Sequence, residues 1–328
     1  MRDERAKEIA EHIDRLVTVD FHTRQFIIDL YEAARKKMGN LPLTYAAAKA
    51  LIDAVKPSST IVFLPGFPTF GTYIAEQDGP VGASMLARVL AELFEARVVV
   101  LTDGRQVDMV KGTFMGAGFS IADSLDEVVH NHQALIEGIK ENTQVDASEL
   151  LDKYRPAAVI AIERPSRNIE GKYMSMKGID LSHKIARLDE IVIEAKRRGV
   201  VTIGVGDGGN ELGCGLIRED VSKYHPNGKV IASNVSTDCL VFASISNLGS
   251  YGIAGAVAAI SNDVYVLPSR EVLLSTLIKA ASCGLHNGPP LWLDPGTDGI
   301  PYDIELFVWE AIRRMIWEEL NPHFPKFY

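Results

Sequence analysis

The sequence predicts a doubly wound, Rossmann-like α/β fold with a mainly parallel sheet and an N-terminal helical addition. Short apolar, β-branched runs alternate with segments of helical spacing through most of the chain. Continuous apolar strands of this kind are buried on both faces, as in parallel sheets whose crossovers are helices. Polar, Gly-rich segments follow several of the strands directly, which is typical of loops at the carboxyl edge of such a sheet.

The N-terminal part, residues 1–55, is predicted to form helices packed on the main domain, because Ile9, Ile13 and Leu16 recur at helical spacing. Residues 56–328 are predicted to form one α/β catalytic domain, without a linker or an internal repeat. Its predicted strands are 60–64, 97–101, 157–162, 200–205, 240–245 and 264–266, and its predicted helices are 81–94, 107–116, 124–142, 185–198, 250–260, 270–282 and 304–319.

Charge and composition exclude several classes of protein. The 328 residues include 34 Lys and Arg against 43 Asp and Glu, a formal net charge of −9. An acidic chain without a basic stripe is not built to hold a polyanion, so we predict no nucleic-acid partner. Cys214, Cys239 and Cys283 form no CxxC or Cys/His zinc pattern. Together with an N-terminus unlike a signal or transit peptide, this predicts a cytoplasmic protein.

Two segments bear on contacts with a membrane or with another subunit. The stretch 239–262 carries no charge and is long enough to span a bilayer. Ser, Asn and Gly interrupt it, however, so we predict a buried strand, a turn and a small-residue helix, with no membrane contact. The aromatic tail 322–328 is predicted to pack on its own domain or on a neighbouring subunit, which leaves a homo-oligomer open.

The polar loops behind the predicted strands hold the candidate functional residues, and four such loops at one edge are the strongest functional signal in the sequence. In open parallel sheets, ligands bind beyond the carboxyl ends of the strands. We therefore expect a small-molecule site at this edge. Its candidates, in chain order, are Thr69, Glu76, Asp78, Asp103, Glu163, Arg164, Lys172, Lys177, Asp207, Gly208, Gly209, Asn210 and Glu211, with Asp298 in a later polar turn.

The glycines Gly204, Gly206 and Gly209 form a literal GxGxxG after a predicted strand, as a dinucleotide fingerprint does. Asp207 and Glu211 would place carboxylates where a pyrophosphate must lie, so a nucleotide-binding enzyme is only a minor alternative. The backbone N–H groups of this turn could instead stabilise a developing oxyanion.

Side chains of opposite sign gather in these loops. Asp207 and Glu211 suit a ligand ammonium or a divalent metal, and Asp207, Asn210, Glu211 and Asp103 are candidate oxygen ligands for Mg²⁺ or Mn²⁺. No fixed spacing specifies such a site, so we predict no required cofactor and keep a divalent metal as the alternative. Arg164, one residue beyond a predicted strand, is the side chain suited to grip a carboxylate bidentately.

An ordered set of motifs resembles the C-terminal domain of D-glutamate cyclases over about residues 60–315. The motifs are GFPT (66–69), EQDGP (76–80), LTD (101–103), ERP (163–165), GKYMSMKG (171–178), GDGGNELG (206–213) and SNLGSYG (246–252). The resemblance implies a hydro-lyase that dehydrates D-glutamate to 5-oxo-D-proline (pyroglutamate) within one molecule. The family's mitochondrial members carry a further N-terminal domain, where this chain has the helical residues 1–55.

Roles for the candidates are inferred from charge and position. Arg164, with Lys172 or Lys177, would hold substrate carboxylate. Asp207 or Glu211 would hold the ammonium and remove its proton, and Glu163 or Glu76 would protonate the departing oxygen. Thr69, Asp78, Asn210, Gly208, Gly209 and Asp298 complete the predicted substrate-binding set.

This hypothesis requires Arg164 and Glu211 to share a cavity. It also predicts that Arg164→Ala and Glu211→Gln abolish turnover while leaving the melting temperature nearly unchanged. The alternatives are a non-catalytic module that binds an amino acid or small acid, and a metal-dependent lyase or hydrolase acting on another small carboxylate.

Overall fold

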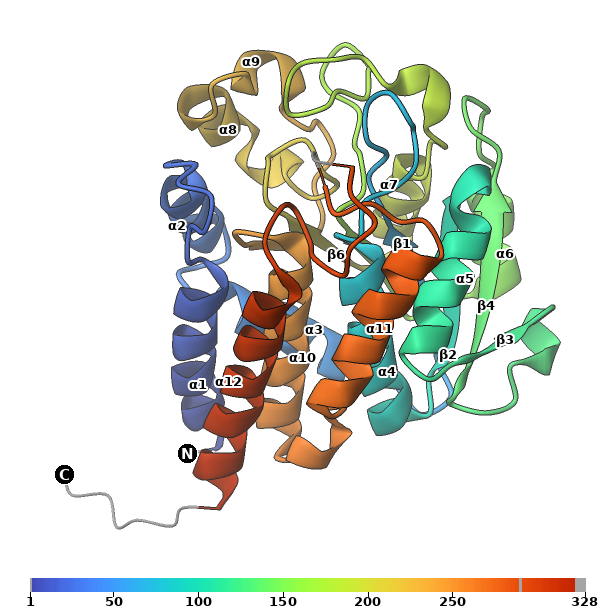
Figure 1. Ribbon diagram of the computed structural model, residues 1–328. Coiled ribbons are helices and arrows are strands. Elements are labelled where there is room, and N and C mark those ends of the chain that lie inside the picture. The colour runs from blue at the N-terminus through green and yellow to red at the C-terminus, as the bar shows by residue number, and fades with distance from the viewer. Residues whose placement is uncertain (1, 289–290, 322–328) are drawn as a thin grey trace.

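The structure is a computed structural model that describes residues 2–288 and 291–321 (Figure 1). The described strands form a seven-stranded parallel sheet in the order β3-β4-β2-β1-β5-β6-β7. The predicted α/β class is confirmed. The strands are β1 (Thr60–Pro65), β2 (Arg97–Asp103), β3 (Ser120–Ala122), β4 (Gln133–Ile139), β5 (Ala158–Ile162), β6 (Val201–Gly206) and β7 (Cys239–Phe242).

Helices cover both faces of the sheet (Figure 1), because successive side chains of the central strands β1 and β5 are mostly apolar and point to opposite faces. In β1, Ile61 and Phe63 belong to one core, and Val62 and Leu64 belong to the other. The helices are α1 (Arg2–Val17), α2 (Ile27–Lys37), α3 (Leu43–Ala54), α4 (Pro80–Phe94), α5 (Val107–Gly116), α6 (Ala147–Tyr154), α7 (Asp189–Arg197), α8 (Arg218–Tyr224), α9 (Gly228–Ile231), α10 (Ser246–Ser261), α11 (Arg270–Ser282) and α12 (Tyr302–Leu320).

The two faces differ in how many helices cover them. α6 and α7 supply the core on the face of Val62 and Leu64. The opposite core is larger and joins α4, α5, α10, α11 and α12 to the three N-terminal helices. The N-terminal segment therefore packs on the sheet domain, with α1 and α3 against α10. The domain boundary at residue 55 stays a prediction.

The order of the strands reverses between β1 and β5. On one side of β1 the chain adds β2, then β3 at the edge of the sheet, and then β4 between β2 and β3. It then returns to the other side of β1 and adds β5, β6 and β7 in order. Loops that leave neighbouring strands at such a reversal run in opposite directions, which opens a crevice at the carboxyl ends of the strands. The crevice between β1 and β5 is where the functional site lies.

Two predicted elements are wrong. Residues 124–142, predicted as a helix, form a short 3₁₀ turn (Leu125–Glu127) and the strand β4, which pairs with β2 and β3. The apolar run of β4 gains a partner strand on each side, and this pairing outweighs local helical spacing. Residues 264–266, predicted as a strand, form a 3₁₀ turn in which the Asp263 carboxylate accepts the Tyr265 N–H at 2.9 Å.

The uncharged stretch 239–262 folds as predicted into a strand, a turn and a helix, here β7 and the buried helix α10. Among the described residues, no helix combines the length and apolarity needed to cross a membrane. The tail 322–328 lies outside the described residues, so its predicted packing is not addressed by the structure.

Candidate functional site

A cavity of about 270 Å³ lies at the carboxyl ends of β1, β5 and β6. The exposed fractions of the lining residues distinguish the floor of the cavity from its mouth. Asp207 and Asn210 are buried, whereas Phe70 and Leu291 at the mouth are 56% and 38% exposed. The floor is therefore acidic and polar, and the rim is largely apolar. The lining residues are Arg24, Phe67, Pro68, Thr69, Phe70, Glu76, Glu163, Ser175, Met176, Lys177, Ile179, Asp207, Asn210, Leu291 and Asp298.

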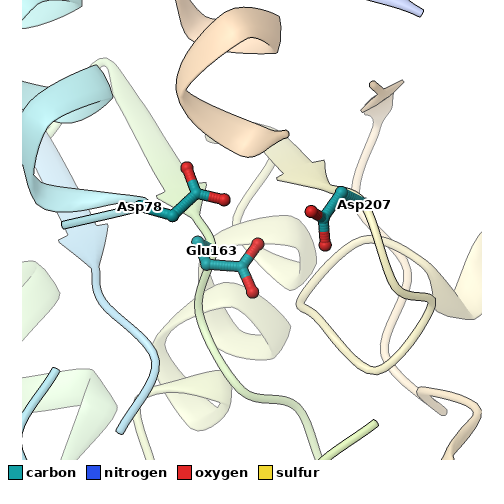
Figure 2. Close-up of side chains that lie close together, drawn as sticks. All are labelled: Asp78, Glu163 and Asp207. Carbon is teal, nitrogen blue, oxygen red and sulfur yellow. The ribbon is translucent and has the colours of Figure 1, made fainter. Parts of the chain in front are cut away.

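Three buried carboxyl groups converge at this end of the sheet, and two of them, Glu163 and Asp207, line the cavity. Figure 2 shows Asp78, Glu163 and Asp207 reaching toward one another from three separate segments. Asp78 precedes α4, Glu163 follows β5 and Asp207 follows β6. One oxygen of each lies within 4.8 Å of the others, and all three residues are buried. The parallel sheet brings together side chains that are far apart in the sequence.

Asp78 is held by the start of helix α10. Its carboxylate accepts the backbone N–H groups of Ser246 at 3.0 Å and Asn247 at 2.6 Å. In return, the Asn247 side-chain oxygen accepts the N–H groups of Gly79 and Gly82 at the start of α4. Each helix thus receives from the other the acceptor that its first N–H groups lack. This exchange fixes the Asp78 carboxylate beside the cavity.

Glu163 reaches the cavity from a left-handed backbone conformation, with φ +47°. This conformation is costly for a non-Gly residue and persists only where the surroundings impose it. The carboxylate accepts a hydrogen bond from the Ser246 hydroxyl at 2.6 Å. The Ser246 segment therefore holds both Asp78 and Glu163.

Arg24 lines the cavity but is absent from the residues predicted from the sequence. It comes from the loop between α1 and α2 and donates from Nη1 to Asp207 at 2.8 Å and from Nη2 to Asp298. The Asp20 carboxylate anchors this loop by accepting the backbone N–H groups of Arg24 and Gln25. No motif marks Arg24, because a single arginine in a loop between two helices has no sequence signature.

Arg164 does not line the cavity. Its guanidinium donates to both oxygens of Asp103 at 2.6 and 2.9 Å, and also to the Ala186 carbonyl at 2.8 Å. It directly follows Glu163, whose left-handed backbone (φ +47°) turns the chain at the end of β5. Neither Arg164 nor Glu211, which the sequence-based hypothesis required to share a cavity, is among the residues that line this one. Asp103, predicted as a metal ligand, is committed to Arg164 instead.

Glu211 stabilises the glycine turn rather than facing the cavity. Its two carboxylate oxygens accept the N–H groups of Gly208 at 3.0 Å and Gly209 at 2.8 Å. These N–H groups are therefore not free to bind a pyrophosphate or an oxyanion, as the sequence analysis had considered. The segment behind β6 also opens no helix directly, since a 3₁₀ turn (Gly215–Ile217) precedes α8.

Most of the remaining predicted residues line the cavity, whereas Asp78 is buried outside its lining and Lys172 lies at the surface. Thr69, Glu76, Lys177, Asn210 and Asp298 line the cavity together with Glu163 and Asp207. Lys172 is an exposed residue that pairs with Glu170 at 2.9 Å and lies outside the lining. Their predicted roles in substrate binding and catalysis stay predictions.

Comparison with known proteins assigns the family. A family model described as "D-glutamate cyclase-like, C-terminal" matches residues 13–313 of the chain. The chain belongs to this D-glutamate cyclase-like family. The resemblance inferred from the motifs is confirmed, and the match begins earlier than they suggested. It starts inside α1, so it includes the loop that carries Arg24.

Human mitochondrial D-glutamate cyclase is similar to this D-glutamate cyclase-like domain. The two are 31% identical over 242 residues, which is 71% of this chain and 37% of the human protein. The chain thus spans little more than a third of the length of that relative.

Burial dominates the electrostatics of the cavity in this D-glutamate cyclase-like chain. Burial raises the pKa of Glu76, Asp78 and Glu163 well above the ordinary carboxyl range, and neighbouring carboxylates raise it further. It also raises the pKa of Asp207 to about 8, although the Arg24 charge opposes the shift. Carboxyl groups in such a cluster need protons or a nearby cation, so the site can donate protons or bind a positively charged ligand.

Proposed function

We propose that this domain is a D-glutamate cyclase-like lyase that converts D-glutamate into 5-oxo-D-proline and water. One observation carries the proposal: the Arg24 guanidinium lies between Asp207 and Asp298 at the wall of an acid-lined cavity. A substrate with one ammonium and two carboxylates needs groups of both signs within one small space. Membership of the family and the similarity to human D-glutamate cyclase support the same reaction.

The reaction needs no co-reactant. The substrate nitrogen attacks the side-chain carboxyl carbon, a C–N bond closes the five-membered ring, and one C–O bond breaks. The nitrogen loses two protons and the departing oxygen gains two, so the leaving molecule is water. The protein must therefore fold the substrate, accept a proton at one point and deliver a proton at another.

We assign these tasks to cavity residues. Arg24 has N–H donors beyond those that bind Asp207 and Asp298, and we propose that they hold a substrate carboxylate. Asp298 accepts one proton from the nitrogen, and Glu76 donates one proton to the departing oxygen. The second proton of the nitrogen passes to the same oxygen as the C–O bond breaks, so that water leaves. Holding the amine against the carboxyl supplies the rest of the acceleration, because a carboxylate is a poor electrophile.

A second candidate is favoured by the convergence of Asp78, Glu163 and Asp207. Three buried carboxyl groups whose oxygens lie within 4.8 Å of one another can hold a divalent cation. A metal-dependent lyase or hydrolase acting on another small carboxylate would use the same cavity.

The test is to incubate the purified chain with D-glutamate or L-glutamate and to follow ring closure by NMR. We expect 5-oxo-D-proline from D-glutamate. Glu76→Gln keeps the size of the side chain but removes its proton-transfer role, so it should lower kcat by about 10²-fold or more. Thermal stabilisation by D-glutamate without any product would instead identify a binding module.

Asp14→Asn provides the control for this variant. Asp14 is another buried carboxyl, but it lies among α1, α2 and α3, where it accepts hydrogen bonds from Tyr31 and the Leu43 N–H. We expect it to lower the melting temperature while keeping kcat near the wild-type value. Equal kcat in Glu76→Gln and the wild type would contradict the role of Glu76.

A further inference from the structure

We infer that Asp78, Glu163, Asp207 and Asn210 form a binding site for one hard divalent cation, Mg²⁺ or Mn²⁺. The first support is the geometry of the carboxylates. Their converging oxygens lie within 4.8 Å of one another (Figure 2). Oxygen ligands at about 2.1 Å from one ion lie about 3 to 4 Å apart across an octahedron, so oxygens within 4.8 Å of one another need only small side-chain shifts to share an ion.

Two of these carboxylates keep a free oxygen. Glu163 uses Oε2 for the Ser246 hydroxyl, and Asp207 uses Oδ2 for Arg24. Within residues 2–288 and 291–321, no donor reaches the second oxygen of either group. Asp78 accepts N–H groups through both oxygens, but a carboxylate oxygen has a further lone pair with which to bind an ion.

Asn210 supplies an independent observation. It is 1% exposed and lines the same cavity as Glu163 and Asp207. Its Nδ2 donates to the Met174 carbonyl at 2.8 Å, which sets the orientation of the amide. Its Oδ1 is buried and has no hydrogen-bond partner among the described residues. A buried carbonyl oxygen without a donor is unfavourable, and a bound cation would satisfy it.

The excess of carboxylates over cationic side chains around the cavity favours binding of a cation. Among the described residues, the cavity is lined by the carboxyl groups of Glu76, Glu163, Asp207 and Asp298, with Asp78 beside two of them, against the guanidinium of Arg24 and the exposed ammonium of Lys177. The substrate of the proposed function has a net negative charge as well. A divalent cation offsets this excess and polarises the carboxyl group that the amine attacks. This role rests on the proposed function, whereas binding of the ion does not.

The donor set selects the class of metal. Carboxylate and amide oxygens are the ligands that Mg²⁺ and Mn²⁺ prefer, while Zn²⁺ and copper favour His and Cys. The nearest thiol, Cys214, donates to Glu211 at 3.4 Å and does not line the cavity.

The experiment titrates Mn²⁺ and then Mg²⁺ into the full chain after removal of metals by EDTA, with calorimetry and Mn²⁺ EPR as readouts. We expect one saturable site per chain. Glu163→Gln and Asp207→Asn should each weaken Mn²⁺ binding by about tenfold or more. Glu76→Gln is the matched control, because it removes a carboxylate of the same cavity outside the ligand set and should weaken binding much less.

Asp78→Asn is avoided as the main variant because Asp78 also stabilises the start of α10. Circular dichroism of each variant verifies its fold before titration. Failure of the wild type to bind either ion saturably would overturn the proposal. So would an Mn²⁺ affinity that is the same in Glu163→Gln, Asp207→Asn and the wild type.

The two proposals fail separately. Undiminished turnover of D-glutamate in EDTA would remove the catalytic role of the ion and leave the proposed function intact. Specific Mn²⁺ binding without any 5-oxoproline would support the metal site and count against the proposed function.

Discussion

The guanidinium of Arg164 is fully buried, which is unusual for an arginine. It joins the loop after β5 to the end of β2 through Asp103, and it also donates to the carbonyls of Gly66 and Ala186. Asp103 in turn accepts the Ala186 N–H at 2.6 Å. The pair therefore holds together four segments, and neither of its residues is among those that line the cavity.

Arg164→Ala should therefore act on stability. It leaves the Asp103 carboxylate buried without its counter-charge, a change that costs about 3–5 kcal/mol in other proteins. We expect a loss of this size in the free energy of unfolding measured with urea. This replaces the expectation from sequence that the melting temperature would hardly change.

Arg105→Ala is the matched control for Arg164→Ala, since Arg105 pairs with Glu141 at 3.0 Å in a partly exposed setting. Exposed pairs contribute about 0–1 kcal/mol. A comparably small loss for Arg164→Ala would show that its ion pair is not structural.

At the scale of single residues, the sequence identifies the loops that contribute to the cavity, but not which of two adjacent residues in a loop faces it. Charge at a strand end correctly brings Glu163 and Asp207 to the cavity. Whether residue 163 or 164 faces inward depends on the path of the backbone after β5, which charge patterns do not encode. Arg24 reaches the site only through the packing of helices that are distant in sequence, so no local pattern indicates it.

Helix α10 is the element around which the larger core is assembled. Its glycines allow neighbouring helices to approach closely: a Cβ at Gly252 would lie 2.7 Å from Thr44 Cγ2, and one at Gly255 would lie 2.4 Å from Ile312 Cγ2. α10 therefore contacts α1, α3, α4 and α12 along its length. Its first turn holds Asp78 and Glu163, so this packing also positions the site.

Gly255→Ala should destabilise the protein even though alanine favours a helix by about 1 kcal/mol over glycine. The added methyl overlaps the buried Ile312 and lies 3.1 Å from Ile13 Cδ1. Overpacking of this kind costs about 1–3 kcal/mol. Urea unfolding measures the change.

The double variant Gly255→Ala/Ile312→Ala identifies the cause. If overlap is responsible, the two losses combine to less than their sum, because removing the Ile312 branch makes room for the new methyl. Additive losses, or a single variant more stable than the wild type, would refute the packing argument.

Elements with a clear hydrophobic pattern in their own sequence are predictable. Elements that depend on a neighbouring strand are not. The apolar strands β1, β2, β5 and β6 and the glycine-rich α10 follow from local sequence. β4 does not, because its apolar positions suit a helix until β2 and β3 lie alongside it. The 3₁₀ turn Val264–Val266 is β-branched but has no strand beside it among the described residues.

For the molecule as a whole, the N-terminal helices are part of both the core and the site. Ile13 and Val17 of α1 are buried against α10, in the same core as residues of the sheet. The loop between α1 and α2 places Arg24 against Asp207 and Asp298. In the same loop, His22 Nε2 lies 2.7 Å from the Asp298 carbonyl oxygen. The sequence predicts helices here but does not predict that they complete the cavity.

A chain of residues 56–328 alone should consequently fail to fold cooperatively. Removing α1–α3 exposes the apolar face of α10 and one side of β7, and burial of apolar surface is worth about 25 cal/mol per Å². It also removes Arg24, which leaves the buried Asp207 carboxyl without its cation. We expect no cooperative thermal transition by circular dichroism and no turnover of D-glutamate.

Arg24→Gln in the full chain separates the two effects of this truncation. It keeps the helices and should retain a cooperative transition, while binding of D-glutamate weakens because the substrate carboxylate loses its guanidinium partner. If residues 56–328 melt as cooperatively as the full chain, the N-terminal helices are an independent addition. Because α10 both contacts those helices and holds Asp78 and Glu163 at its first turn, we expect instead that stability and catalysis are lost together.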